Sequence, residues 1–93
     1  MGGSWSTFEK VGVGVTYQDA VRDARRNIRT KGYPVSGVYE VEVDGEPYHY
    51  MYFNHGWYRV YAYRYDNMRV HVDLNYLNNP PAALKKIKLS NAS

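Results

Sequence analysis

The sequence predicts an α+β domain in which one α-helix packs across an antiparallel sheet of four to five strands, in the order β-α-β-β-β-β. Apolar side chains recur with helical spacing between Tyr17 and Ile28, and the stretches before and after this segment alternate with the period of two that strands have. Short turn sequences, Asp44-Gly45 and Asn54-His55-Gly56, separate consecutive alternating stretches. Because short turns join antiparallel neighbours, the strands after the helix should form a meander beneath it.

Length and composition set the broad class. The chain has 93 residues, a formal net charge of +3 and no cysteine, so it is one small domain without disulfide bonds or thiolate chemistry. No apolar run approaches the roughly 18 residues of a membrane span, and no signal peptide is visible. We therefore expect a cytoplasmic protein that has no membrane partner. Residues 1–7 are expected to be a flexible N-terminus, 8–77 the domain, and 78–93 a basic C-terminal segment that is either a short helix or disordered.

The first predicted strand runs from Phe8 to Tyr17. Valine alternates with small residues, so one face is apolar and the other is nearly bare backbone at Gly12 and Gly14. Glycine inside a strand indicates that another group approaches the backbone closely. That group is either a packed side chain, such as a tyrosine of a neighbouring strand, or a ligand, and packing is the favoured interpretation.

The helix is expected to begin after Thr16, whose hydroxyl can accept a hydrogen bond from the backbone N–H of Asp19, and to run through Lys31. Gly32 and the nearby Pro34 provide its stop signal. One stripe of the helix is apolar and should face the sheet: Tyr17, Ala20, Val21, Ala24 and Ile28.

The opposite side of the helix carries what we call the arginine comb: Arg22, Arg25, Arg26 and Arg29. With about 100° per residue these side chains fall within roughly 100° of one another. One interpretation is a solvated face, in which Asp19 and Asp23 offset part of the repulsion and the helix dipole favours cations near the C-terminus. The other is a comb that binds phosphates or acidic side chains.

The second strand is expected over Gly37–Val43, ending at the turn Asp44-Gly45. Pro47 follows, so we expect the turn either to contain more than two residues or to be bulged. A three-residue turn would place the apolar side of this strand with Met51 and Phe53. It would set the glutamates of the other side beside the tyrosines. The residues concerned are Tyr39, Val41 and Val43 on the apolar side, and Glu40 and Glu42 on the other.

A tyrosine-rich hairpin over residues 48–65 is the most unusual stretch of the chain. Pairing of Phe53 with Tyr58 would place aliphatic side chains on one face and phenols on the other, whereas a three-residue loop would pair Phe53 with Trp57. The first register is favoured, because so many buried tyrosine hydroxyls could hardly all find partners. It gives one face Met51, Phe53, Val60 and Ala62, and the other Tyr48, Tyr50, Tyr52, Arg59, Tyr61 and Tyr63.

The last predicted strand runs from Met68 to Leu74, after a turn at Asp66-Asn67. Pairing of Ala62 with Val70 would unite the aliphatic side chains and set Arg59 opposite Asp73. The sequence leaves open which edge of the sheet the first strand joins. Asn79 is expected near the N-terminal cap of a short helix over Pro81–Leu89, which would dock on the domain, bind a partner or fray.

No enzyme motif is present. His49, His55 and His71 lack the paired spacing of a zinc site, and no nucleophile or convergent carboxylates stand out. We therefore predict no catalytic, metal or cofactor residues, and no enzyme. The predicted partner-binding residues are the arginine comb together with Tyr48, Tyr50, Tyr52, Arg59, Tyr61 and Tyr63. The competing interpretation of these tyrosines is a second buried layer under the C-terminal segment, or a homodimer seam.

The layout resembles that of small phage-encoded anti-defence proteins, including anti-CRISPR inhibitors. The resemblance rests on a valine strand, the Thr-capped helix YQDAVRDARRNIRTKG and a tyrosine-rich meander, over residues 8–74. It concerns size and element order, and it transfers no residue role. It implies a non-enzymatic inhibitor that binds a nuclease or surveillance complex in the cytoplasm of a bacterial host. Many such inhibitors are acidic mimics of DNA, whereas this basic chain would suit guide RNA or an acidic protein patch.

Three hypotheses of function follow. The first is a non-enzymatic inhibitor or adaptor of a protein or ribonucleoprotein complex, with the arginine comb and the tyrosine face as contacts. The second is a domain that binds RNA or DNA directly through the same surfaces. The third is an orphan or idealised fold without an evolved site. A homodimer is compatible with each of them.

Overall fold

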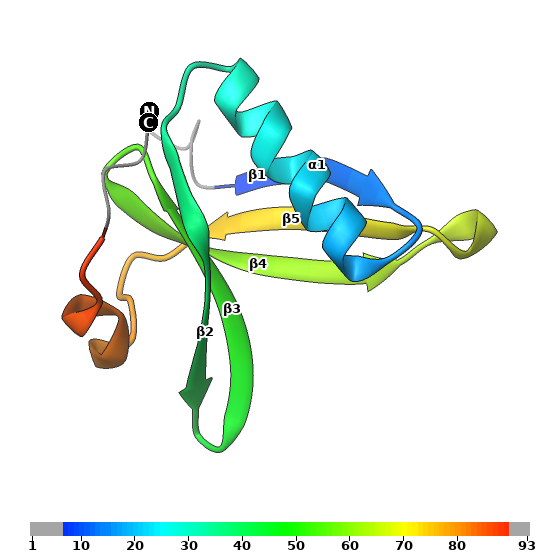
Figure 1. The fold of residues 1–93 in the computed structure, drawn as a ribbon. Coiled ribbons are helices and arrows are strands. Elements are labelled where there is room, and N and C mark those ends of the chain that lie inside the picture. Colours follow the sequence, from blue (N-terminus) through cyan, green and yellow to red (C-terminus); the bar gives the residue numbers. More distant parts are fainter. Residues whose placement is uncertain (1–6, 90–93) are drawn as a thin grey trace.

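The computed structural model describes residues 7–89, which form one five-stranded antiparallel sheet with a helix across one face (Figure 1). The strand order is β1-β5-β4-β3-β2, so the first strand joins the edge beside the last. The predicted fold class and element order are confirmed. The bounds are β1 Thr7–Gly14, α1 Tyr17–Thr30, β2 Val35–Val43, β3 Glu46–Phe53, β4 Gly56–Arg64 and β5 Val70–Tyr76. Within residues 7–89, no helix has the length and apolar character needed to cross a membrane.

Helix α1 forms as its caps predict. The Thr16 hydroxyl accepts a hydrogen bond from the Asp19 backbone N–H at 3.1 Å, and the helix ends with Lys31 as its C-cap. Gly32 then turns the chain at φ +95°. The predicted apolar stripe is buried against the sheet at Ala20, Val21, Ala24 and Ile28, while Tyr17 is half-buried.

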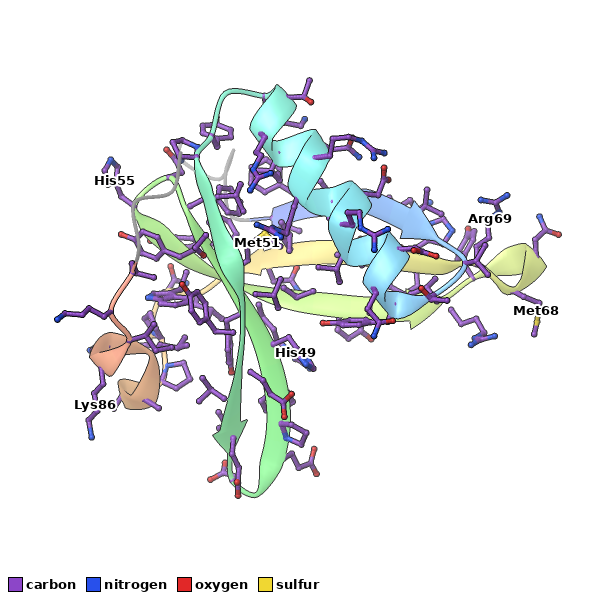
Figure 2. The ribbon with its side chains drawn as sticks, viewed as in Figure 1. His49, Met51, His55, Met68, Arg69 and Lys86 are labelled. Atoms are coloured by element: carbon purple, nitrogen blue, oxygen red, sulfur yellow. The ribbon has the colours of Figure 1, made fainter. Side chains whose placement is uncertain are left out.

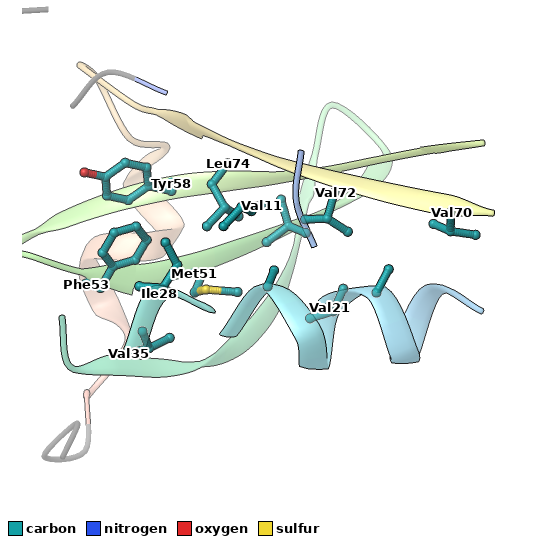
Figure 3. Close-up of a cluster of buried hydrophobic side chains, with 13 residues drawn as sticks. Val11, Val21, Ile28, Val35, Met51, Phe53, Tyr58, Val70, Val72 and Leu74 are labelled. Atoms are coloured by element: carbon teal, nitrogen blue, oxygen red, sulfur yellow. The ribbon is translucent and has the colours of Figure 1, made fainter. Parts of the chain in front are cut away.

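The main core lies between α1 and the sheet (Figure 3). Alternate residues of the three central strands point toward the helix, which is why the aliphatic residues of β4 and β5 gather there. At one end the Phe53 and Tyr58 rings stack with centroids 4.1 Å apart. The strand residues buried in this core are Val11, Val35, Met51, Phe53, Tyr58, Val60, Val70, Val72 and Leu74.

Close approach of α1 explains the glycines of β1. A Cβ added at Gly12 would lie 2.7 Å from the Ala24 Cβ, and one at Gly14 would lie 2.6 Å from the Ala20 backbone nitrogen. The packing interpretation is therefore confirmed, but the neighbour is the helix and not a tyrosine. The amide of Asn27 also donates to the Val11 carbonyl at 2.6 Å, which ties helix to strand.

Strand β1 differs from its prediction in two respects. It ends at Gly14, because the chain must turn there to start α1, and Val13 and Val15 are exposed. It also bulges between Phe8 and Gly12, where Lys10 has φ 49°. The bulge allows the Lys10 N–H to hydrogen-bond to the carboxylate of Asp73 on β5.

The tyrosine hairpin has a register that sequence reasoning did not reach. Its turn contains two residues, Asn54 and His55, both with positive φ, and Phe53 pairs with Gly56. The prediction that Phe53 pairs with Tyr58 is wrong by two residues. Because a shift of two keeps each side chain on its face, the predicted division into an aliphatic and a tyrosine face is correct.

The same kind of error affects the hairpin of β4 and β5. Ala62 pairs with Val72 and not with Val70, so the faces are again right while the partners are wrong. Arg59 lies opposite Asn75, and Asp73 lies opposite Tyr61. The expected Arg59–Asp73 pair is therefore absent from the cross-strand register.

In the hairpin of β2 and β3, the side chains of β2 lie on the opposite face of the sheet from the one predicted. Asp44 and Gly45 form a two-residue turn with φ 52° and 84°, so the expected three-residue turn is wrong. Tyr39 now pairs with Tyr50, and the odd shift moves the apolar side of β2 onto the tyrosine face of the sheet. The glutamates move to the helix face, where Glu40 lies 3.4 Å from the imidazole of His49. Figure 2 shows His49 together with Met51 on β3.

The C-terminal segment docks on the sheet over the part that the structure describes. The short helix expected over Pro81–Leu89 is present as a 3-10 helix of narrower bounds, Ala82–Lys86. Leu84 is only 1% exposed and packs against Tyr50 and Trp57 in a second, smaller core on the face away from α1. The expected flexible N-terminus lies outside the described residues except for Thr7, which belongs to β1.

Candidate functional site

The sheet face away from α1 has a covered part and an open part. Under the C-terminal segment, Tyr50 is 3% and Trp57 8% exposed, with Tyr52 half-buried beside them. Tyr48 is also half-buried and lies where the covered part meets the open part. The prediction that Tyr50 belongs to an exposed tyrosine surface is therefore wrong. The competing interpretation, a second buried layer under the C-terminal segment, holds for this part of the face alone.

The open part carries aromatic rings and cations side by side, which we call the outer row. On β4, Tyr61 and Tyr63 lie at alternate positions with ring centroids 5.9 Å apart, and Tyr61 is 44% exposed. Tyr65, which follows β4, continues the series at 6.2 Å from Tyr63. The outer row consists of Tyr48, Arg59, Tyr61, Tyr63, Tyr65, His71 and Lys10.

Each end of the outer row holds a cation against a ring. The Arg59 guanidinium lies 4.4 Å from the ring centroid of Tyr48 and 5.5 Å from that of Tyr61, so it bridges β3 and β4. At the other end the Lys10 ammonium lies 5.1 Å from the centroid of Tyr65. These contacts place positive charge at both ends of the row.

His71 completes the centre of the row from β5. Its ring lies nearly parallel to Tyr63, with centroids 5.7 Å apart and an interplanar angle of 22°, and meets Tyr65 at 4.8 Å. Asp73, also on β5, contributes the opposite charge. Desolvation first, then Asp73, raises the pKa of the Tyr63 hydroxyl. The outer row is therefore aromatic with mixed charge.

The arginine comb lies on the outward side of α1, across the sheet from the outer row. Arg22 pairs with Asp19 at 3.1 Å, and Arg26 pairs with Asp23. Among the side chains that the structure describes, neither Arg25 nor Arg29 forms an ion pair. The two groups of predicted contact residues thus face opposite directions and cannot meet one flat partner surface together.

Sequence reasoning missed three members of the outer row. Tyr65 continues the period of two, so its signal was present. His71 reaches the row because it lies opposite Tyr63, which only the register reveals. Lys10 reaches it after the bulge in β1. The sequence carries no signal for that bulge.

The described side chains contain no group of three or more histidines and carboxylates placed to hold a metal ion. A small hollow of about 260 Å³ is lined by Asn54, His55, Tyr58 and Tyr76.

Tyr17 has a buried phenol hydroxyl on the side of the sheet that α1 covers. Its ring packs 5.3 Å from His49, and its hydroxyl is buried without a hydrogen-bond partner among the described residues. Burial first, and then the charge of Glu40, raises the pKa of this phenol. Since a raised pKa in the folded state disfavours ionisation, the stabilisation is complete below the unfolded value of 10.0 and is lost as pH rises further.

We expect Tyr17→Phe to raise the free energy of unfolding at pH 7 by about 1 kcal/mol, because it removes a buried hydroxyl that has no partner. Above pH 10 the advantage over the wild type should grow, since the variant has no phenol to ionise at this position. Urea titrations at pH 7, 9 and 10.5 measure both effects. A variant less stable than the wild type at pH 7 would show that the hydroxyl is hydrogen-bonded in solution.

Comparison with known proteins adds no relative: no protein-family model matches the chain, and neither a curated protein nor a solved structure is significantly similar to it.

Proposed function

We propose that the protein is a non-enzymatic binding protein that takes single-stranded nucleic acid on the outer row. The observation that supports this best is the uncovered strip of rings on β4, with the Arg59 and Lys10 cations at its two ends. Rings on an open sheet face stack on unpaired bases, and adjacent cations attract the phosphates between those bases.

The spacing of the outer row supports the same partner. Alternate residues on a strand are about 6.6 Å apart, and the centroids along Tyr61, Tyr63 and Tyr65 follow at 5.9 and 6.2 Å. Consecutive bases could therefore meet consecutive rings. Duplex nucleic acid hides its base faces, so the outer row should discriminate against it.

The test is a fluorescence anisotropy titration with single-stranded RNA, single-stranded DNA and duplex DNA at about 50 and 200 mM salt. Wild type should bind single strands more tightly than duplex, with affinity falling as salt rises. The double variant Tyr61→Ala/Tyr63→Ala should lose at least about 30-fold in affinity, since it removes two rings and stacking contributes about 1–3 kcal/mol per base.

The matched control is Tyr61→Phe/Tyr63→Phe, which keeps both rings and removes both hydroxyls. Its affinity should stay within about threefold of the wild type if stacking carries the binding. Equal losses in the alanine and phenylalanine variants would show that the hydroxyls act instead. A wild type that binds no single strand at 50 mM salt would rule the proposal out.

A second candidate is an inhibitor or adaptor of a nucleoprotein complex, of the anti-CRISPR type that the layout resembles. It is favoured by the opposite placement of the outer row and the arginine comb, because two contact surfaces back to back can join two parts of an assembly. In this function the chain works in the cytoplasm of a bacterial host and catalyses nothing.

The second candidate predicts inhibition of DNA cleavage by at least one purified RNA-guided nuclease. Inhibition should weaken when all four residues of the arginine comb are changed to glutamate in a variant that circular dichroism shows to be folded. Absence of inhibition across a panel of such nucleases would count against it. If the chain also binds no nucleic acid, the remaining hypothesis is a fold without an evolved site.

A further inference from the structure

The four arginines of the comb are not equivalent. Asp19 and Asp23 lie one helical turn before Arg22 and Arg26 and neutralise those two side chains. Arg25 and Arg29 are also one turn apart, but no described carboxylate pairs with either of them. The outward side of α1 therefore holds a pair of neighbouring cations without a counter-ion among the described side chains.

The surroundings of Arg25 distinguish this pair of arginines from ordinary solvated side chains on a helix surface. The Arg25 Nε is buried and finds no hydrogen-bond acceptor among the described residues, although a partly buried guanidinium N–H normally has one. Burial first, and then the charge of Arg29, lowers the pKa of Arg25. The fold thus keeps two like charges together at a cost that a bound anion would relieve.

The space beside the pair suits a small anion. An open hollow of about 460 Å³ is lined by the whole comb and by Thr30. A guanidinium presents its N–H groups as a planar fork that matches phosphate oxygens, and two forks one turn apart can grip one tetrahedral group from two sides. A dianion would neutralise both unpaired arginines, whereas a single carboxylate would neutralise one.

We propose that Arg25 and Arg29 form a binding site for a phosphate dianion, either inorganic phosphate or the phosphate of a phosphomonoester. The site is independent of the outer row, because the sheet lies between them. It also goes beyond single-strand binding, since the diester phosphates of a nucleic-acid backbone carry one charge each. Arg22 and Arg26 act as flanking residues whose charges are already paired.

The probes are inorganic phosphate and O-phosphoserine, titrated at constant ionic strength and pH 7.5 and followed by the NMR signals of the arginine Nε–H groups. The wild type should saturate with the largest shifts at Arg25 and Arg29. Arg25→Gln and Arg29→Gln should each weaken binding at least 10-fold. The matched controls Arg22→Gln and Arg26→Gln, which remove paired charges from the same helix, should stay within about threefold.

Three results would overturn the proposal. One is a wild type that does not saturate with either probe. Another is an equal loss in all four glutamine variants, which would indicate diffuse charge attraction. The third is binding of succinate or dimethyl phosphate as tight as that of inorganic phosphate, which would assign the pair to carboxylates or to phosphodiesters. If inorganic phosphate binds and O-phosphoserine does not, the ligand of the site is the free phosphate ion. If both probes bind, the site also accepts phosphomonoesters.

Discussion

Gly12→Ala should lower the free energy of unfolding by about 3 kcal/mol, the upper end of the usual cost of overpacking. The new Cβ would meet the carbonyl oxygen of Ala20 and lie 2.7 Å from both the Ala24 Cβ and its backbone nitrogen. These obstacles belong to the helix backbone or to its shortest side chain, so no rotamer change can relieve them. Either α1 lifts from the sheet or β1 moves away from β5.

The matched control is Gly37→Ala on β2. Nothing lies within 4 Å of a Cβ added at Gly37, and its φ is not positive. That change should alter stability by less than about 0.5 kcal/mol, or raise it slightly by reducing the freedom of the unfolded chain. Urea denaturation followed by circular dichroism compares the two variants. Equal stabilities would mean that α1 does not sit as close to β1 in solution.

Leu84→Ala should lower the free energy of unfolding by about 2–4 kcal/mol. Leu84 is 1% exposed. Truncation of a buried leucine to alanine costs the transfer free energy of the removed atoms and leaves a cavity. Its neighbours Tyr50 and Trp57 would then gain contact with water. In a Trp5→Phe background, the emission of Trp57 should shift to longer wavelength before the main unfolding transition.

Lys85→Ala serves as the control for this variant. Lys85 is exposed in the same 3-10 helix, so its removal should change stability by less than about 0.5 kcal/mol. If Leu84→Ala changes neither the stability nor the Trp57 emission, the C-terminal segment does not cover the sheet in solution. The tyrosine face would then be more extensive than the outer row.

Sequence reasoning placed the side chains of the central strands on the correct faces but did not find their partners. Alternation identifies a face, whereas the pairing depends on how many residues each turn uses. The turn at Asn54 and His55 needs two left-handed residues, and the sequence pointed instead to Gly56 as its flexible member. On β2 the wrong turn length had a larger effect. It shifted the predicted pairing by an odd number of residues, and such a shift moves every side chain to the other face of the sheet.

The candidate site was predictable where it depends on one strand and obscure where it depends on the whole fold. Tyr61 and Tyr63 could be proposed from alternation alone. Burial of Tyr50 was one of two open interpretations, because it results from the docking of a short, lysine-rich segment that has a weak apolar pattern of its own. Lys10 required the bulge in β1, and the unequal pairing within the arginine comb required side-chain geometry.

The position of β1 at the far edge of the sheet has a consequence for the order of folding. The β2–β3 and β3–β4 hairpins join neighbours in the chain, but Gly14 pairs with Val70 and Phe8 with Leu74. A ribosome must therefore release β5 before β1 finds its strand partner, although α1 has its main contacts with β1, which precedes it in the chain. Contacts between such distant positions slow folding, so closure of the sheet by its two terminal strands should be the last and rate-limiting event.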